Sequence, residues 1–207
     1  MARVGLLGGT FNPPHIGHLV CAQEALDQLE LDRVLFVPVR VPPHKEIEAE
    51  PGVEHRVAMC AAAIAGDPRF AVSRVDADRL GPSFSVDTLR ALNAEAPGDD
   101  LTFIVGGDMA HSLPTWREPE AVLALAELGV DEREGVVRAD IAERLAGLAG
   151  AADRVRFFSM PRIDVSSSLI RRRAAAGAPL RYLVPDSVLD YIAQQGLYEG
   201  HLSLGGT

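Results

Sequence analysis

Apolar segments of two kinds alternate along this chain, and their alternation constrains the fold more than any other feature. Short runs rich in β-branched and aromatic residues are followed by longer segments with apolar residues at helical spacing. The predicted strands are 3–7, 33–39, 70–75, 101–105 and 155–158. Because buried strands separated by helices pair in parallel, we predict an α/β fold, a Rossmann-like doubly wound sheet of about five to six strands.

Helices are predicted on both faces of this sheet, and glycines such as Gly177 and Gly196 mark where they end. The predicted helices are 16–29, 53–65, 85–94, 119–128, 137–148, 167–176 and 185–195, with a short one beginning at Asp108. We find no repeat, low-complexity block or linker in the sequence. We therefore predict one domain over 1–198, followed by a flexible tail over 199–207.

Composition excludes several classes of protein. The 207 residues are 47% hydrophobic and 24% charged, as in ordinary globular domains, and no apolar run approaches the roughly 20 residues of a membrane span. A net charge of −9 argues against nucleic acid as a partner. Cys21 and Cys60 lie in apolar, helix-like segments, which favours buried thiols in a reducing cytoplasm. The sequence leaves open whether the chain forms a homo-oligomer.

The segment 8–18, GGTFNPPHIGH, connects the first predicted strand to the first predicted helix. Ligands bind at the carboxyl ends of strands in such sheets. Gly8 and Gly9 let a ligand approach the backbone, and the two prolines stiffen the loop. His15 and His18 share one face of the first helical turn, and Gly17 keeps that turn bare. Since a helix amino terminus favours anions, this segment predicts a phosphate site.

Other interpretations of this segment are weaker. Its glycines do not match G-x-G-x-x-G, and no Gly-Lys-Ser/Thr follows to make a Walker A loop. His15 and His18 supply only two zinc ligands, and no nearby Cys or Glu pattern completes a tetrahedral set. A tight turn whose histidines merely cap or pack is the simplest structural alternative.

The segment resembles a signature of the nucleotidyltransferase superfamily related to class I aminoacyl-tRNA synthetases, because residues 15–18 spell HIGH. Residues 165–171, VSSSLIR, match the second signature of its adenylyltransferases. Between them lie PPHK (42–45), PSFSVDTL (82–89), GGD (106–108) and LPTWREPE (113–120). In this order the segments resemble the bacterial nicotinate-mononucleotide adenylyltransferases, from about Val4 to Tyr198.

The resemblance implies that the chain transfers the adenylyl group of ATP to nicotinate mononucleotide, yielding deamido-NAD and pyrophosphate. It implies that Mg²⁺ arrives on the triphosphate, since this ion keeps its waters and needs few protein ligands. His15, His18 and Arg171 are the expected catalytic residues. The expected ATP contacts are Gly8, Gly9, Thr10, Phe11, Asn12, His15, Gly17, His18, Gly106, Asp108, Ser167, Ser168 and Arg171.

The resemblance also assigns residues to the mononucleotide. His44 and Lys45 are expected to grip its phosphate, Trp116 to stack on its pyridine ring, and Thr88 to lie on the substrate side. Each residue type has an ordinary alternative. A loop lysine is usually solvated, a lone tryptophan usually belongs to a core, and Asp108 also suits a helix N-cap.

Several functions remain as alternatives. A sister enzyme would use the amide, nicotinamide mononucleotide, and one or two polar contacts hidden from the sequence would decide between acid and amide. Another branch, such as pantetheine-phosphate adenylyltransferase, is disfavoured by PPHK and by the TWR of residues 115–117. A regulatory nucleotide-binding module without catalysis is disfavoured by His15, His18 and Arg171. We assign no product contacts to the acidic segment 129–150.

Overall fold

The computed structural model describes residues 1–42, 47–132 and 138–199. Its centre is one sheet of six parallel strands in the order β3-β2-β1-β4-β5-β6, which confirms the predicted fold class. The strands are β1 (Arg3–Gly9), β2 (Arg33–Pro38), β3 (Phe70–Val72), β4 (Asp100–Gly106), β5 (Glu127–Glu132) and β6 (Val155–Ser159). Since β1 pairs with both β2 and β4, the winding direction of the chain reverses between β1 and β4.

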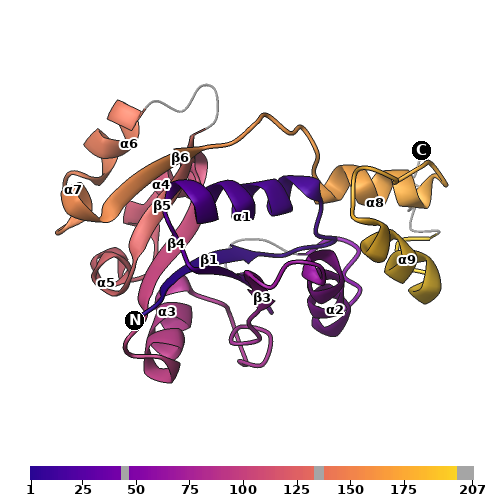
Figure 1. Ribbon diagram of the computed structural model, residues 1–207, viewed down its shortest axis with the longest axis horizontal. Coiled ribbons are helices and arrows are strands. Elements are labelled where there is room, and N and C mark those ends of the chain that lie inside the picture. Colours follow the sequence, from indigo (N-terminus) through magenta and orange to yellow (C-terminus); the bar gives the residue numbers. More distant parts are fainter. Residues whose placement is uncertain (43–46, 133–137, 200–207) are drawn as a thin grey trace, which may run out of the picture.

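Helices connect the strands and cover the sheet, with α1 and α3 on opposite sides (Figure 1). Helices α8 and α9 lie at the end of the molecule opposite α6 and α7 (Figure 1). Among the described residues, no helix is both long and apolar enough to cross a bilayer. The helices are α1 (Ile16–Gln28), α2 (Val53–Ile64), α3 (Ser85–Glu95), α4 (Gly107–Ser112), the 3₁₀ turn η1 (Leu113–Thr115), α5 (Pro119–Leu125), α6 (Arg138–Leu145), α7 (Ala151–Arg154), α8 (Ser167–Ala175) and α9 (Asp186–Gln195).

The core has two layers because successive strand residues point to opposite faces of the sheet. Leu6 packs into a cluster with α3, α5 and α6, whereas its neighbour Leu7 packs into a cluster with α1 and α2. A third apolar cluster lies beyond the sheet and joins α2, α8, α9 and Tyr198. This third cluster fixes the last helices to the rest of the domain.

The sequence-based prediction missed one strand, β5. The predicted helix 119–128 included residues 127–128, but α5 ends at Leu125 and these two residues begin β5. The prediction placed the rest of β5 in a charged segment. The strand carries Asp131 and Glu132, yet Leu128, Gly129, Val130 and Asp131 are buried between β4 and β6. The helix predicted from 137 is described as α6, Arg138–Leu145, and most of the predicted tail lies outside the described residues.

Of the two cysteines, only Cys60 is buried as expected, and its burial raises the pKa of the thiol. Cys21 is half-buried instead, because it lies on the side of α1 that lines the cavity described below.

Gly129 provides a test of the packing between α1 and the sheet. A Cβ atom at this position would lie 2.6 Å from Cδ1 of Leu29 and 3.1 Å from Cγ2 of Thr102. We expect Gly129→Ala to lower the free energy of unfolding by about 1–3 kcal/mol, the usual cost of overpacking. Gly66→Ala is the control, because nothing lies within 4 Å of the added Cβ there. Urea denaturation measures both, and equal midpoints would contradict the close packing.

Candidate active site

A cavity of about 630 Å³ opens at the carboxyl ends of β1 and β4, where the winding of the sheet reverses. Its volume is in the range of small-molecule sites, and its position is the one that doubly wound sheets use for ligands. Its walls come from the ends of β1, β4 and β5, the starts of α1 and α3, the turn at 116–117 and the segment 160–166. Predicted site residues that line it are Gly8, Gly9, Thr10, His15, Gly17, His18, Gly106 and Trp116.

His15 and His18 form a stacked pair at the start of α1. Their ring centroids are 3.7 Å apart with 28° between the planes. The backbone N–H of His15 donates to Nδ1 of His18 over 3.1 Å, so the neutral His18 ring carries its proton on Nε2. Gly17 permits this arrangement, because a Cβ there would lie 3.1 Å from Nδ1 of His15. Two imidazoles are thereby fixed beside the amino terminus of a helix, as an anion site requires.

Phe11 and Asn12 anchor the loop before the histidines through contacts that lie outside the cavity lining. Phe11 is buried and packs edge-on against His18, at 5.0 Å between centroids. Asn12 is 1% exposed, and its amide donates to the carbonyl of Glu48 over 2.9 Å. The hydroxyl of Tyr198 donates to Oδ1 of Asn12 over 2.6 Å, and burial raises the pKa of this phenol. Neither Phe11 nor Asn12 lines the cavity, so the structure places both as supports of the loop.

The second signature meets this loop at the start of α8. Ser167 donates its hydroxyl to the carbonyl of Pro13 over 2.8 Å, and Nη1 of Arg171 donates to the carbonyl of Asn12 over 3.0 Å. Ser166 is the N-cap, accepting from the backbone of Leu169, and it lines the cavity. Ser167, Ser168 and Arg171 lie beside the cavity and do not line it. The structure thus brings together two signatures that are far apart in the sequence, since Pro13 and Ser167 differ by 154 in residue number.

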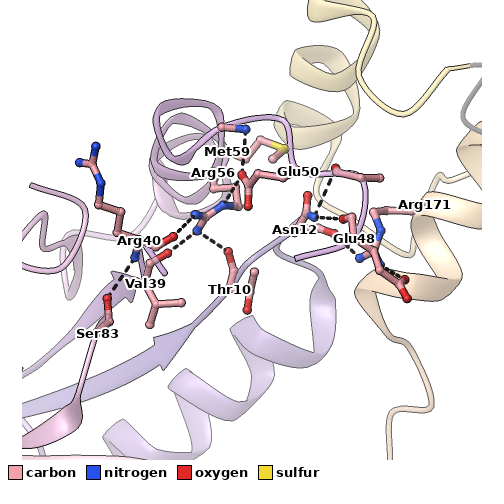
Figure 2. A network of polar contacts seen from close by, with 12 residues as sticks. Thr10, Asn12, Val39, Arg40, Glu48, Glu50, Arg56, Met59, Ser83 and Arg171 are labelled. Atoms are coloured by element: carbon pink, nitrogen blue, oxygen red, sulfur yellow. Dashed lines mark hydrogen bonds and ion pairs between the residues drawn. The ribbon is translucent and has the colours of Figure 1, made fainter. Parts of the chain in front are cut away.

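Arg171 also forms an ion pair on its outer side. Its Nη2 lies 3.0 Å from Oε2 of Glu48, a side chain that is 83% exposed (Figure 2). The same nitrogen donates to the hydroxyl of Ser168 over 3.3 Å. The carboxylate of Glu48 is therefore paired with the guanidinium that the resemblance assigns to ATP.

Aromatic rings form the other end of the cavity. Trp116 is half-buried, donates its indole N–H to Oγ of Ser112 over 3.0 Å, and packs edge-to-face on Phe103 at 5.9 Å. Phe84, at the N-cap of α3, lines the same end, and the guanidinium of Arg117 lies 5.0 Å from the centre of its ring. Trp116 is thus an anchored aromatic surface inside the cavity, as expected for a ring-stacking residue.

These features can be compared with known proteins. The family model described as cytidylyltransferase-like matches residues 6–173. The chain is 44% identical to a probable nicotinate-nucleotide adenylyltransferase of Thermomicrobium roseum, over 96% of this chain and 92% of that protein. It is 45% identical to a protein of the same name from Symbiobacterium thermophilum, over 96% of both.

The chain belongs to the cytidylyltransferase-like family and, within it, to the nicotinate-nucleotide adenylyltransferases. A solved structure supports the fold. Plasmodium falciparum nicotinic acid mononucleotide adenylyltransferase complexed with NaAD superposes with a TM-score of 0.75 at 16% identity, covering 96% of this chain and 98% of that one.

Two further residues of the predicted site, Thr88 and Asp108, do not line the cavity. Thr88 is 2% exposed, and its hydroxyl contacts Oδ1 of Asp76 at 2.6 Å. Burial raises the pKa of Asp76, while Thr88 and Arg79 oppose that rise. Thr88 therefore supports the segment of Phe84, because its hydroxyl lies 3.2 Å from the carbonyl oxygen of Phe84.

Asp108 is exposed on the first turn of α4, beside Gly106 and Met109, which line the cavity. His44 and Lys45 lie outside the described residues.

Arg56, in α2, is a supporting residue that sequence reasoning missed. Its side chain has no exposed surface and donates to the carbonyls of Thr10 at 2.9 Å, Val39 at 2.7 Å and Arg40 at 3.3 Å (Figure 2). Its Nε donates to Glu50 at 2.9 Å. The available signal was an arginine directly before the apolar run VAMCAAAI (57–64) of the same helix. Arg56 joins the ends of β1 and β2 just before the histidine loop.

A second missed residue is Asp131, at the carboxyl end of β5. It is 1% exposed and lines the cavity. It was missed because its strand was missed. Its carboxyl group belongs to the only acidic residue among the described residues that line the cavity.

Removing the Arg56 guanidinium tests whether it holds the strand ends. We expect Arg56→Met to lower the free energy of unfolding by about 3–5 kcal/mol, because three buried carbonyls lose their donor and Glu50 loses its partner. The control is Arg74→Met, on an exposed arginine that pairs with Glu54 and Asp78 and should matter little. Urea denaturation compares the two, and similar losses in both variants would contradict this role.

Proposed function

We propose that this protein transfers the adenylyl group of ATP to nicotinate mononucleotide, which forms deamido-NAD and pyrophosphate. The observation that most directly supports this activity is the stacked His15–His18 pair at the start of α1. Both residues line the cavity between β1 and β4, where the winding of the sheet reverses. The names of the relatives, identical at more than 40% over nearly the whole chain, support the same activity.

The proposed reaction needs positioning and charge stabilisation. An oxygen of the mononucleotide phosphate attacks the α-phosphorus of ATP, and the bond from that phosphorus to the bridging oxygen of pyrophosphate breaks. The attacking oxygen is already ionised at neutral pH, so no general base is required. The increase in charge and crowding around the α-phosphorus is met by fixed donors, as in phosphoryl transfer generally.

In this proposal His15 and His18 donate to the phosphates of ATP. The fixed stacking and the backbone bond to Nδ1 of His18 orient that ring before substrate arrives. The backbones of Gly8, Gly9, Thr10 and Gly106 approach the nucleotide, with Asp108 beside its ribose. Ser167, Ser168 and Arg171 hold the departing pyrophosphate, for which Arg171 exchanges Glu48 for phosphate oxygens.

Magnesium is proposed to enter with the triphosphate. Asp131 is the one carboxylate among the described lining residues, and no cluster of three metal-ligating side chains occurs in the described part of the chain. This fits an ion whose ligands are mainly phosphate oxygens and water. When bound, the ion would neutralise phosphate charge.

The mononucleotide is proposed to occupy the aromatic end of the cavity. Trp116 would stack on its pyridine ring, because the indole is anchored and faces the cavity. His44 and Lys45 would bind its phosphate, and Thr88 would act indirectly by supporting the segment of Phe84.

The activity is tested by supplying ATP and Mg²⁺ with nicotinate mononucleotide, nicotinamide mononucleotide or pantetheine phosphate. We expect pyrophosphate release and a dinucleotide product with nicotinate mononucleotide, and a much lower kcat/KM with the amide. Activity with pantetheine phosphate alone, or with no acceptor, would refute the proposal. Removing Mg²⁺ with a chelator should abolish the reaction, and adding it back should restore it.

The histidine pair is tested by His18→Ala. We expect kcat to fall by roughly 10²–10³-fold, the usual loss for one preorganised electrostatic donor. The matched control is His111→Ala, on an exposed histidine of α4 that does not line the cavity, and it should keep the original kcat. Pyrophosphate release at saturating substrates measures both, and a near-normal kcat in His18→Ala would remove this ring from the mechanism.

A further inference from the structure

We propose that the carboxylate of Glu48 competes with pyrophosphate for the guanidinium of Arg171 and thereby helps this product to leave. The inference rests on the proposed function, in which Arg171 holds the departing pyrophosphate, and deepens it by assigning a role to Glu48. It begins from the ion pair between Nη2 of Arg171 and Oε2 of Glu48, at 3.0 Å. Arg171 belongs to α8, whose N-cap Ser166 lines the cavity, so the pair lies beside the proposed phosphate site.

The backbone that carries Glu48 is held in place by two buried side chains. The amide of Asn12 donates to the carbonyls of Glu48 at 2.9 Å and of Ala49 at 3.5 Å. On the other side, Nε of Arg56 donates to the carboxylate of Glu50 at 2.9 Å (Figure 2). Because Asn12 and Arg56 are themselves buried, these contacts fix the point from which the Glu48 side chain leaves the backbone.

Ala49, the next residue, has a backbone conformation that residues with a Cβ atom rarely adopt. Its φ of 46° lies in the left-handed region. Such a conformation persists where surrounding contacts hold it, and here Asn12 bonds to the carbonyl of Ala49 itself. The segment therefore keeps one shape, and in that shape the carboxylate of Glu48 meets Arg171.

The two partners of the ion pair differ in their freedom to move. The Arg171 side chain is 13% exposed, and its Nη1 donates to the carbonyl of Asn12 at 3.0 Å. The Glu48 side chain is 83% exposed, so its carboxylate can turn into solvent at little cost. An incoming phosphate would therefore displace the carboxylate, while the guanidinium stays where Asn12 holds it.

Carboxylate and phosphate oxygens accept from a guanidinium in the same way, so they compete for the same donors. A ligand that uses Arg171 must first break the ion pair, and its apparent affinity falls by the fraction of protein in which the pair is open. When pyrophosphate leaves, the returning carboxylate gives Arg171 its other partner. Since product release limits many enzymes, a weaker hold on pyrophosphate favours turnover.

The test measures the dissociation constants of pyrophosphate and AMP by isothermal titration calorimetry in Mg²⁺ buffer, with the wild type and Glu48→Gln. We expect Glu48→Gln to bind pyrophosphate about two- to five-fold more tightly, the range of one exposed ion pair. AMP should bind equally to both proteins, because it lacks the phosphates that become pyrophosphate. In turnover assays, pyrophosphate should become a stronger product inhibitor by the same factor.

Two further variants separate this competition from a general effect of charge. Glu54→Gln removes the same charge from a 69% exposed side chain of α2 that pairs with Arg74, and it should leave both dissociation constants unchanged. In an Arg171→Met background, Glu48→Gln should no longer tighten pyrophosphate binding, because the carboxylate has no guanidinium to occupy. If Arg171→Met does not fold, Glu54→Gln and the AMP comparison still decide.

An unchanged dissociation constant for pyrophosphate in Glu48→Gln would overturn the inference. Equal tightening in Glu54→Gln, or tightening that persists in the Arg171→Met background, would also overturn it, because both results indicate a general effect of protein charge. The proposed function survives each of these results. It fails instead if the wild type releases no pyrophosphate from ATP in the presence of nicotinate mononucleotide.

Discussion

The buried guanidinium of Arg56 lies where β1 and β2 leave the sheet. Past this point the carbonyls of Thr10, Val39 and Arg40 need donors that the strand ladder does not supply, and a buried carbonyl without one is costly. One side chain from α2 serves all three. The backbone conformation directly after β1 is therefore fixed, and the positions of the residues from Thr10 to His18 depend on it.

This loop is then held by contacts from distant parts of the chain. Glu48 supplies a carbonyl to Asn12, Ser167 bonds to Pro13, and Tyr198 bonds to Asn12. With the loop fixed, the two imidazoles stack beside the helix terminus and need no rearrangement to meet an anion. Preorganised donors of this kind supply much of the rate enhancement in enzymes that move phosphorus, because the protein is already oriented when the charge develops.

The sequence predicted the features that depend on local pattern. Alternating apolar runs predicted five of the six strands and the doubly wound class, and the histidine segment was correctly located between β1 and α1. It could not predict β5, because three acidic residues obscure a strand whose burial comes from its neighbours. Nor could it separate the motif residues that line the cavity from those that do not. Asn12 and Thr88 lie in motif segments, yet tertiary partners hold both in a supporting layer. Arg56 was missed because its partners are backbone carbonyls from other segments, which leave no pattern in the sequence.

The hydrogen bond from Tyr198 to Asn12 also constrains when, during synthesis, the loop between β1 and α1 can take its final shape. The loop between β1 and α1 is bonded to Ser167, Arg171 and Tyr198, which are all translated much later than the loop itself. In addition, the backbone N–H of Ile16 donates to the carbonyl of Leu183. A nascent chain stopped before these residues could form β1 to β4 and still lack the final shape of the loop. The loop therefore takes its final shape only once α8, Leu183 and Tyr198 are in place.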